Sequence, residues 1–239
     1  MDIAEPIVAA TRVIEERFPA SRTAFLSNGV LSSRRTPTSD LDIVVVIEGP
    51  PAPYRETIRA HGWIVELFVH TRDSLTFFYD FDAQTRKCTL ARMCADGYVL
   101  RDAWHEAADL QREARAVIDA GPTALTDEER LQRRYALTDV LDDLRGTSNQ
   151  VEIIFIEGQL LQMAGELALV SERRWNGAGK WLARHLDDAP GEFADQLAGA
   201  FRSLVATGDK QPMISVVEKV LELAGGPITE GFSTSKPVG

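Results

Sequence analysis

The segment from Ser27 to Val46, SNGVLSSRRTPTSDLDIVVV, decides how the rest of the sequence is interpreted. Its last seven residues, DLDIVVV, combine Asp40 and Asp42 with a β-branched run that favours a strand. Side chains two apart in a strand point to the same face, so we expect the two carboxylates side by side. Like charges at that distance repel each other unless a cation lies between them. The pattern therefore predicts a divalent metal site.

A third acidic residue completes the expected metal site. Glu66 is the acidic residue of the apolar segment GWIVELFVH (62–70), which is typical of a buried strand. Its neighbours Val65 and Leu67 would point to the opposite face of that strand. Mg²⁺ prefers oxygen ligands and commonly binds through carboxylates and substrate phosphates. Asp40, Asp42 and Glu66 are therefore the candidate ligands of two Mg²⁺ ions.

The loop before the aspartates offers candidate contacts to a phosphate group. Gly29 would let the backbone approach a phosphate closely. Ser27 and Ser33 carry hydroxyl groups, and Arg34, next to Arg35, could form charge-assisted hydrogen bonds to a triphosphate. These residues make the loop a candidate nucleotide-binding segment.

The hydrophobic pattern divides the chain into an α/β half and a helical half. We expect strands at 23–27, 41–47, 62–70 and 98–102, and helices over 3–18, 54–60 and 72–94. From residue 104 onward the pattern is helical almost throughout. The sequence predicts an α+β chain, with a small mixed sheet in residues 1–103 and an all-helical bundle in residues 104–239.

Composition narrows the classes of function. The net charge is −10 and the pI is about 5.0, which argues against a broad nucleic-acid-binding surface. No apolar run approaches the ~20 residues needed to cross a bilayer, and the acidic N-terminus lacks the basic region of a secretion signal. The two cysteines, Cys88 and Cys94, are expected to be packing residues. We therefore expect a cytoplasmic protein without nucleic-acid or membrane partners.

These residues resemble a known family. Residues 23–70 are similar to the nucleotidyltransferase superfamily, which includes DNA polymerase beta. That family has a Gly-Ser turn, an Asp-x-Asp at this spacing and a third carboxylate on a later strand. The corresponding features here are NGV, DLD and Glu66. The segments RRYALTDVLDDL (133–144) and WNGAGKWLARHL (175–186) resemble the helical half of kanamycin and streptomycin nucleotidyltransferases.

The resemblance implies a Mg²⁺-dependent enzyme that transfers a nucleoside monophosphate, with ATP as the expected donor. The acceptor would be a hydroxyl group of a small molecule, and pyrophosphate would be released. Asp40 and Asp42 would be metal ligands, and Glu66 would be either a ligand or the general base. Lys180 would reach the triphosphate, as a lysine of the helical domain does in the resembling enzymes. An aminoglycoside-type antibiotic is the first acceptor that the resemblance suggests.

One departure from the family leaves a second interpretation open. Val30 stands where the family has a phosphate-binding serine. The alternative is a catalytically weak or inactive nucleotidyltransferase-like module that acts through a protein partner, either antitoxin-like or protein-modifying. The three carboxylates and the complete helical half favour the enzyme. Glu157, in IIFIEGQLL (153–161), is a further candidate base, and a homodimer is compatible with the resemblance.

Overall fold

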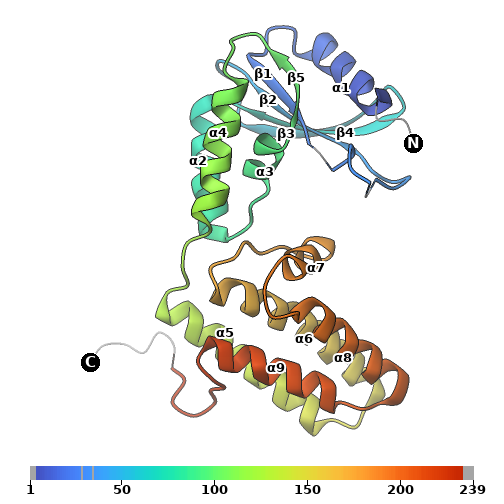
Figure 1. The fold of residues 1–239 in the computed structure, drawn as a ribbon, viewed down its shortest axis with the longest axis vertical. Helices are drawn as coiled ribbons and strands as arrows, with labels where there is room; N and C mark the ends of the chain where they lie inside the picture. The colour runs from blue at the N-terminus through green and yellow to red at the C-terminus, as the bar shows by residue number, and fades with distance from the viewer. Residues whose placement is uncertain (1–3, 28, 34, 234–239) are drawn as a thin grey trace. The chain divides into compact units, whose positions relative to one another are not determined.

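The computed structural model describes residues 4–27, 29–33 and 35–233 of the chain. Its N-terminal part is built on a mixed five-stranded sheet with the strand order β3-β4-β2-β1-β5 (Figure 1). The central pair, β2 and β4, is parallel, and the other neighbouring pairs are antiparallel. The strands are β1 (Thr23–Leu26), β2 (Leu41–Val46), β3 (Tyr54–Ala60), β4 (Trp63–His70) and β5 (Tyr98–Asp102).

The edge strand β3 corrects the sequence analysis, which expected a helix over residues 54–60. Ala60 pairs with Trp63, and the two residues between them, His61 and Gly62, have φ angles of 48° and 84°. Positive φ at both positions is the signature of the tight hairpin turn that joins twisted antiparallel strands. The segment is therefore extended because β4 supplies its hydrogen-bond partners, which local helix propensity does not report.

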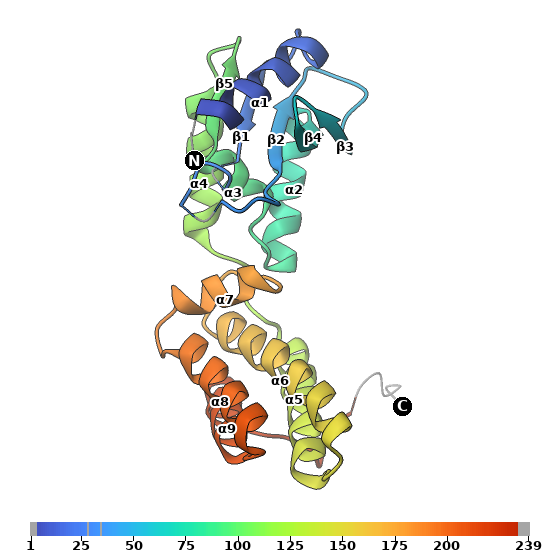
Figure 2. The same cartoon turned by 90° about the vertical axis from the view of Figure 1, so that its right-hand side faces the viewer.

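The sheet has helices on both faces (Figures 1 and 2). Helix α1 (Ala4–Arg17) packs Val13 and Ile14 against the face that carries Ile43 and Val45 of β2. Val44, which lies between Ile43 and Val45 in β2, points to the opposite face and is also fully buried. That second face is covered by α2 (Arg72–Thr85) and α3 (Leu90–Ala95). Because both faces are covered, β2 is an almost continuous apolar run, in which Asp42 is the exception.

Two hydrogen-bonded caps position the helices of the second face. Thr71 and Ser74 form a reciprocal capping box at the start of α2. The buried carboxylate of Asp82 accepts a hydrogen bond from the backbone N–H of Leu90 at 2.9 Å and so caps α3, whose own N-cap residue supplies no side-chain bond. The predicted single helix over 72–94 is therefore two helices.

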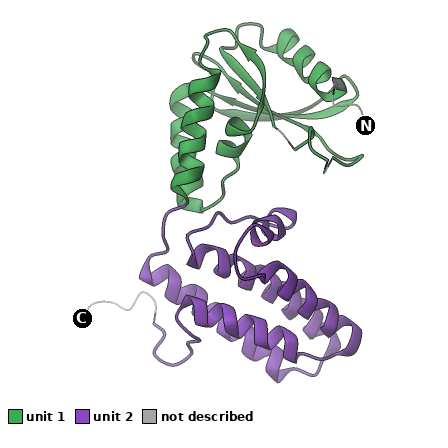
Figure 3. Ribbon diagram, in the orientation of Figure 1, with its two compact units in different colours: residues 1–121 green, residues 122–239 purple. Residues whose placement is uncertain are grey.

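The chain divides into two compact units, residues 1–121 and 122–239 (Figure 3). Helix α4 (Ala107–Ala120) belongs to the first unit because it packs on α3 and α2. Arg22 donates two hydrogen bonds to Glu106, which directly precedes α4, at 2.9 and 2.6 Å. The division therefore follows α4, whereas the sequence analysis placed it near residue 103.

In the described residues of the second unit, 122–233, the elements of regular structure longer than one residue are helices. Its core is formed mainly by buried leucine, valine and alanine side chains, contributed by each helix in this described part of the chain. Helix α6 (Gln150–Ser171) is long and apolar enough to cross a membrane by length and composition. Half of its most apolar stretch is buried inside the protein, as in the core helix of a bundle. The helices are α5 (Asp127–Gly146), α6 (Gln150–Ser171), α7 (Lys180–Asp187), α8 (Phe193–Thr207) and α9 (Gln211–Ala224).

Candidate metal centre

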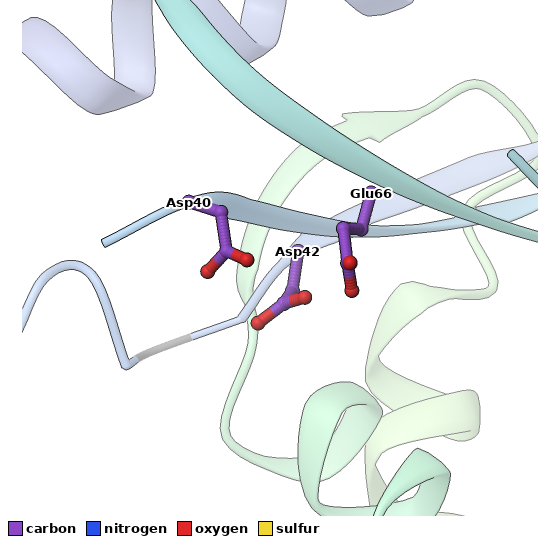
Figure 4. A group of neighbouring side chains, drawn as sticks. All are labelled: Asp40, Asp42 and Glu66. Atoms are coloured by element: carbon purple, nitrogen blue, oxygen red, sulfur yellow. The ribbon is translucent and has the colours of Figure 1, made fainter. Parts of the chain in front are cut away.

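The structure brings Asp40, Asp42 and Glu66 together at the start of β2. Asp40 directly precedes β2, and Asp42 lies opposite Glu66 in the parallel pairing of β2 with β4. Each residue offers one carboxylate oxygen, and these oxygens all lie within 4.8 Å of one another. Figure 4 shows the three side chains pointing to the same side of the sheet. Among the described residues, these three form the group of His, Cys, Asp or Glu side chains that lie close enough together to hold a metal ion.

The cluster carries negative charge that the protein does not fully neutralise. Partial burial, followed by the negative charges of Asp40 and Glu66, raises the pKa of Asp42 to about 6. The positive charge of Arg55 acts in the opposite sense but does not cancel the rise. Asp42 is therefore a carboxylate that would gain from a bound cation.

The geometry fits a hard divalent cation. Oxygen ligands of one Mg²⁺ lie at about 2.1 Å from the ion, so two of them are at most about 4.2 Å apart. The observed limit of 4.8 Å requires only a small inward movement of the side chains. Two metal ions about 3.5–4 Å apart, as in two-metal enzymes, would also find bridging carboxylates here. The donor set contains oxygen only, which favours Mg²⁺, Mn²⁺ or Ca²⁺ over softer metals.

Arg55 is the site residue that the sequence analysis missed. It lies on β3, opposite Phe68 of β4, and its guanidinium donates a hydrogen bond to the Oε2 atom of Glu66. The same guanidinium lies over the Phe68 ring, 4.7 Å from its centroid. A strand expectation for residues 54–60 would have placed Arg55 beside Glu66. The hairpin signal at His61-Gly62 was the available clue.

The glycine loop, which contains Gly29 and joins β1 to β2, is hydrogen-bonded through its backbone to the candidate metal centre. The N–H of Ser27 donates to the carbonyl oxygen of Asp42 at 2.8 Å. Gly29 is exposed, and a Cβ atom built there would meet no atom within 4 Å, so the backbone is open to a ligand. Ser33 is also exposed. Arg34 lies outside the described residues.

Two other residues of the loop have structural contacts. Val30 is only 6% exposed and packs in the core beneath α1. Where the resembling family has a serine, this chain therefore has a residue that contributes to the stability of the fold. Arg35 forms an ion pair with Glu5 at 3.3 Å and lies over the Trp63 ring. The side chain of Arg35 thus fastens the loop to α1 and β4.

Two further candidate residues, Lys180 and Glu157, belong to the second unit. Lys180 is the first residue of α7 and is exposed, and its contact with a triphosphate stays a prediction. Glu157 is 1% exposed, and among the described residues none donates a hydrogen bond to its Oε1 atom. A side chain buried in this way does not reach solvent from α6, so its role as a base also stays a prediction.

Comparisons with known proteins give a likeness among solved structures only. No protein-family model matches the chain, and no curated protein matches it in sequence. Among solved structures, the chain is similar to a nucleotidyltransferase-like protein from Exiguobacterium sibiricum 255-15, with a TM-score of 0.43 and 14% sequence identity. The match covers 91% of this chain and 74% of the other. A superposition at this level does not by itself establish a function.

Proposed function

We propose that the protein is a Mg²⁺-dependent nucleotidyltransferase that transfers a nucleoside monophosphate, with ATP as the first donor to test, to a hydroxyl group of a small molecule. The observation that carries the proposal is the convergence of Asp40, Asp42 and Glu66 on one point with uncompensated negative charge. The resemblance of the NGV and DLD segments to the nucleotidyltransferase pattern supports the same reaction. The open backbone at Gly29 supports a phosphate-binding role for the loop.

The reaction would be an in-line displacement at phosphorus. The acceptor oxygen would bond to the α-phosphorus while the bond to the bridging oxygen of the β-phosphate breaks, and pyrophosphate would leave. Bound Mg²⁺ would supply charge neutralisation and a more acidic acceptor hydroxyl. Asp40 and Asp42 would hold the cation at the start of β2, where the paired strand β4 fixes the separation of Asp42 and Glu66. Glu66 would complete the ligand set or accept the proton from the hydroxyl.

The acceptor proposed first is a hydroxyl-rich small molecule of the aminoglycoside type. Support comes from the sequence resemblance and from the net charge of −10, which attracts a cationic substrate. A fold alone does not fix a substrate, so neutral sugars and anionic alcohols belong in the same panel.

Thermal unfolding with nucleotides is the experiment that tests the metal and donor sites. The midpoint is measured with ATP, GTP, CTP and UTP, each with Mg²⁺ or with a chelator. A ligand that binds the native state raises the midpoint by mass action. We expect a rise that requires both a nucleotide and Mg²⁺ and that is absent in Asp42→Asn.

A matched control separates the site from general charge effects. Asp80→Asn removes the same charge from an exposed position of α2 and should keep the nucleotide-dependent rise. If no nucleotide raises the midpoint of the wild type, the proposed enzyme function is wrong. Where a rise is found, pyrophosphate release with a panel of acceptor hydroxyls identifies the second substrate.

A further inference from the structure

We propose that Arg55 is a positioning residue that holds Glu66 before the metal binds and that a divalent cation must displace it from this carboxylate. The inference rests on the proposed function, because it concerns metal binding at the same three carboxylates. It assigns a role to a residue outside the family's motif. It also predicts that the free protein carries a built-in competitor for its own cofactor.

The sheet geometry brings Arg55 to Glu66. In the antiparallel pairing of β3 and β4, Thr57 lies opposite Glu66 and Arg55 lies opposite Phe68. Arg55 and Thr57 are two apart and share a face, so Arg55 is the diagonal neighbour of Glu66. The guanidinium reaches across this diagonal and donates to Glu66 Oε2. Since β3 is the edge strand next to β4, Arg55 approaches the cluster from the flank opposite to β1 and its glycine loop.

The same contacts make Arg55 able to move away. Its side chain is 58% exposed, whereas that of Glu66 is 22% exposed, so the guanidinium can return to water at little cost. Exposed ion pairs contribute only about 0–1 kcal/mol to stability. The guanidinium also lies over the Phe68 ring, 4.7 Å from its centroid. This cation–π contact would keep the side chain near the site after it leaves Glu66.

Electrostatics makes Arg55 and the metal competitors. The guanidinium partly compensates the carboxylates, which is visible in its lowering effect on the pKa of Asp42. A dication at the cluster would be repelled by the same positive charge and would compete with Arg55 for the carboxylate of Glu66. Removing the charge should therefore strengthen metal binding, although it removes a contact from the site.

The test measures Mn²⁺ binding to the full chain without nucleotide, by titration calorimetry or by the resonance signal of free Mn²⁺. A neighbouring charge at about 4–6 Å moves the pKa of a carboxyl by about 1–3 units, so we expect Arg55→Gln to bind Mn²⁺ at least about tenfold more tightly than the wild type. In a Glu66→Gln background the gain from Arg55→Gln should be much smaller, because the contested ligand is gone.

Arg59→Gln is the matched control. Arg59 is exposed on the same face of β3 and lies two residues from Thr57 on the other side, but it is opposite Ile64. The substitution changes the net charge equally and should alter the Mn²⁺ affinity less than twofold. Equal effects of Arg55→Gln and Arg59→Gln would overturn the inference, because they would indicate a general charge effect.

The remaining outcomes separate the inference from the proposed function. If the wild type binds Mn²⁺, Asp42→Asn does not, and Arg55→Gln binds no more tightly than the wild type, the role of Arg55 is wrong while the metal site stands. If the wild type binds no Mn²⁺, both are wrong. If Arg55→Gln fails to fold, the Nε–H resonance of Arg55 in the wild type gives a second readout. It is assigned as the arginine resonance that is absent in Arg55→Lys. We expect it to shift on addition of Mg²⁺, and an unmoved resonance in the Mg²⁺-bound protein would refute displacement.

Discussion

Asp42 and Glu66 are register partners in the parallel pairing of β2 and β4, and this pairing holds two carboxylates side by side at the centre of a sheet. A one-residue shift of either strand would turn one carboxylate to the opposite face, where α1 packs. The apolar residues that flank both carboxylates are buried on that face, which fixes the register. The core of the first unit and the geometry of the candidate site are therefore specified by the same residues.

The first prediction concerns the stability cost of Asp42 in the absence of metal. Its pKa is raised from an ordinary value of 3.8 to about 6, so the ionised form is disfavoured in the folded protein. We expect Asp42→Asn to raise the free energy of unfolding by about 1–3 kcal/mol at pH 7.5 in chelator, since each pKa unit corresponds to about 1.4 kcal/mol. Urea denaturation followed by circular dichroism measures the change. Asp80→Asn should be neutral, and a destabilised Asp42→Asn would contradict the prediction.

The sequence alone could predict the aspartates but not their full surroundings. The DLDIVVV pattern indicates a buried strand with two carboxylates on one face, because strand periodicity and β-branching act locally. Arg55 could not be placed in the same way. Its strand, β3, exists through pairing with β4 and a turn at His61-Gly62, and pairing is a property of the tertiary structure.

The loop shows a second limit of sequence reasoning. A serine is expected after Gly29 from the family pattern, and Val30 reads as the loss of a phosphate contact. In the structure Val30 is a core residue beneath α1. An apolar residue in a polar loop was a signal for burial, and only the packing of α1 shows what it is buried against.

The second prediction tests Val30 by restoring the family's residue. Val30→Ser removes a buried apolar side chain that is 6% exposed and introduces a hydroxyl among the apolar residues of the core. We expect a loss of about 1–3 kcal/mol in the free energy of unfolding and no increase in nucleotide affinity. Ser33→Ala, at an exposed position of the same loop, is the control and should leave stability unchanged. Tighter nucleotide binding by Val30→Ser would show that the position faces the ligand.

The third prediction concerns Asp82, which caps α3 from within the core. Asp82→Ala would leave the buried N–H of Leu90 without its acceptor, at a cost of about 1–3 kcal/mol. Asp82→Asn keeps an oxygen acceptor and should cost less. Burial raises the pKa of Asp82 to about 6 despite the opposing hydrogen bonds from the backbone of Leu90 and its neighbours.

The pH dependence of Asp82 has a definite sign. A carboxyl with a raised pKa binds its proton more tightly in the folded state, so its contribution to stability is complete below its ordinary pKa of 3.8 and is lost as pH rises through about 6. The wild type should therefore lose stability relative to Asp82→Asn between about pH 4 and pH 6. Parallel stability curves for the two proteins over that range would refute the assignment.

The fourth prediction concerns Glu157, the buried acid of the second unit. Burial raises its pKa above the ordinary 4.5, and its Oε1 atom accepts no hydrogen bond from the described residues. Glu157→Leu replaces this group with an apolar one of similar size among Ile153, Leu160 and their neighbours, so we expect a gain of about 1–3 kcal/mol at pH 7.5. The gain should shrink as the pH falls through the raised pKa of Glu157, and it should be smallest well below 4.5, where the carboxyl is protonated in both the folded and the unfolded state.

Comparison with an exposed position of the same helix completes this test. Gln159→Leu adds a leucine to the solvent-facing side of α6 and should not change stability with pH. Unfolding is followed by tryptophan fluorescence, to which the second unit contributes through Trp175, 7% exposed, and the first unit through Trp63 and Trp104. If Glu157→Leu is instead destabilising at every pH, the prediction that the buried carboxyl is unfavourable is wrong.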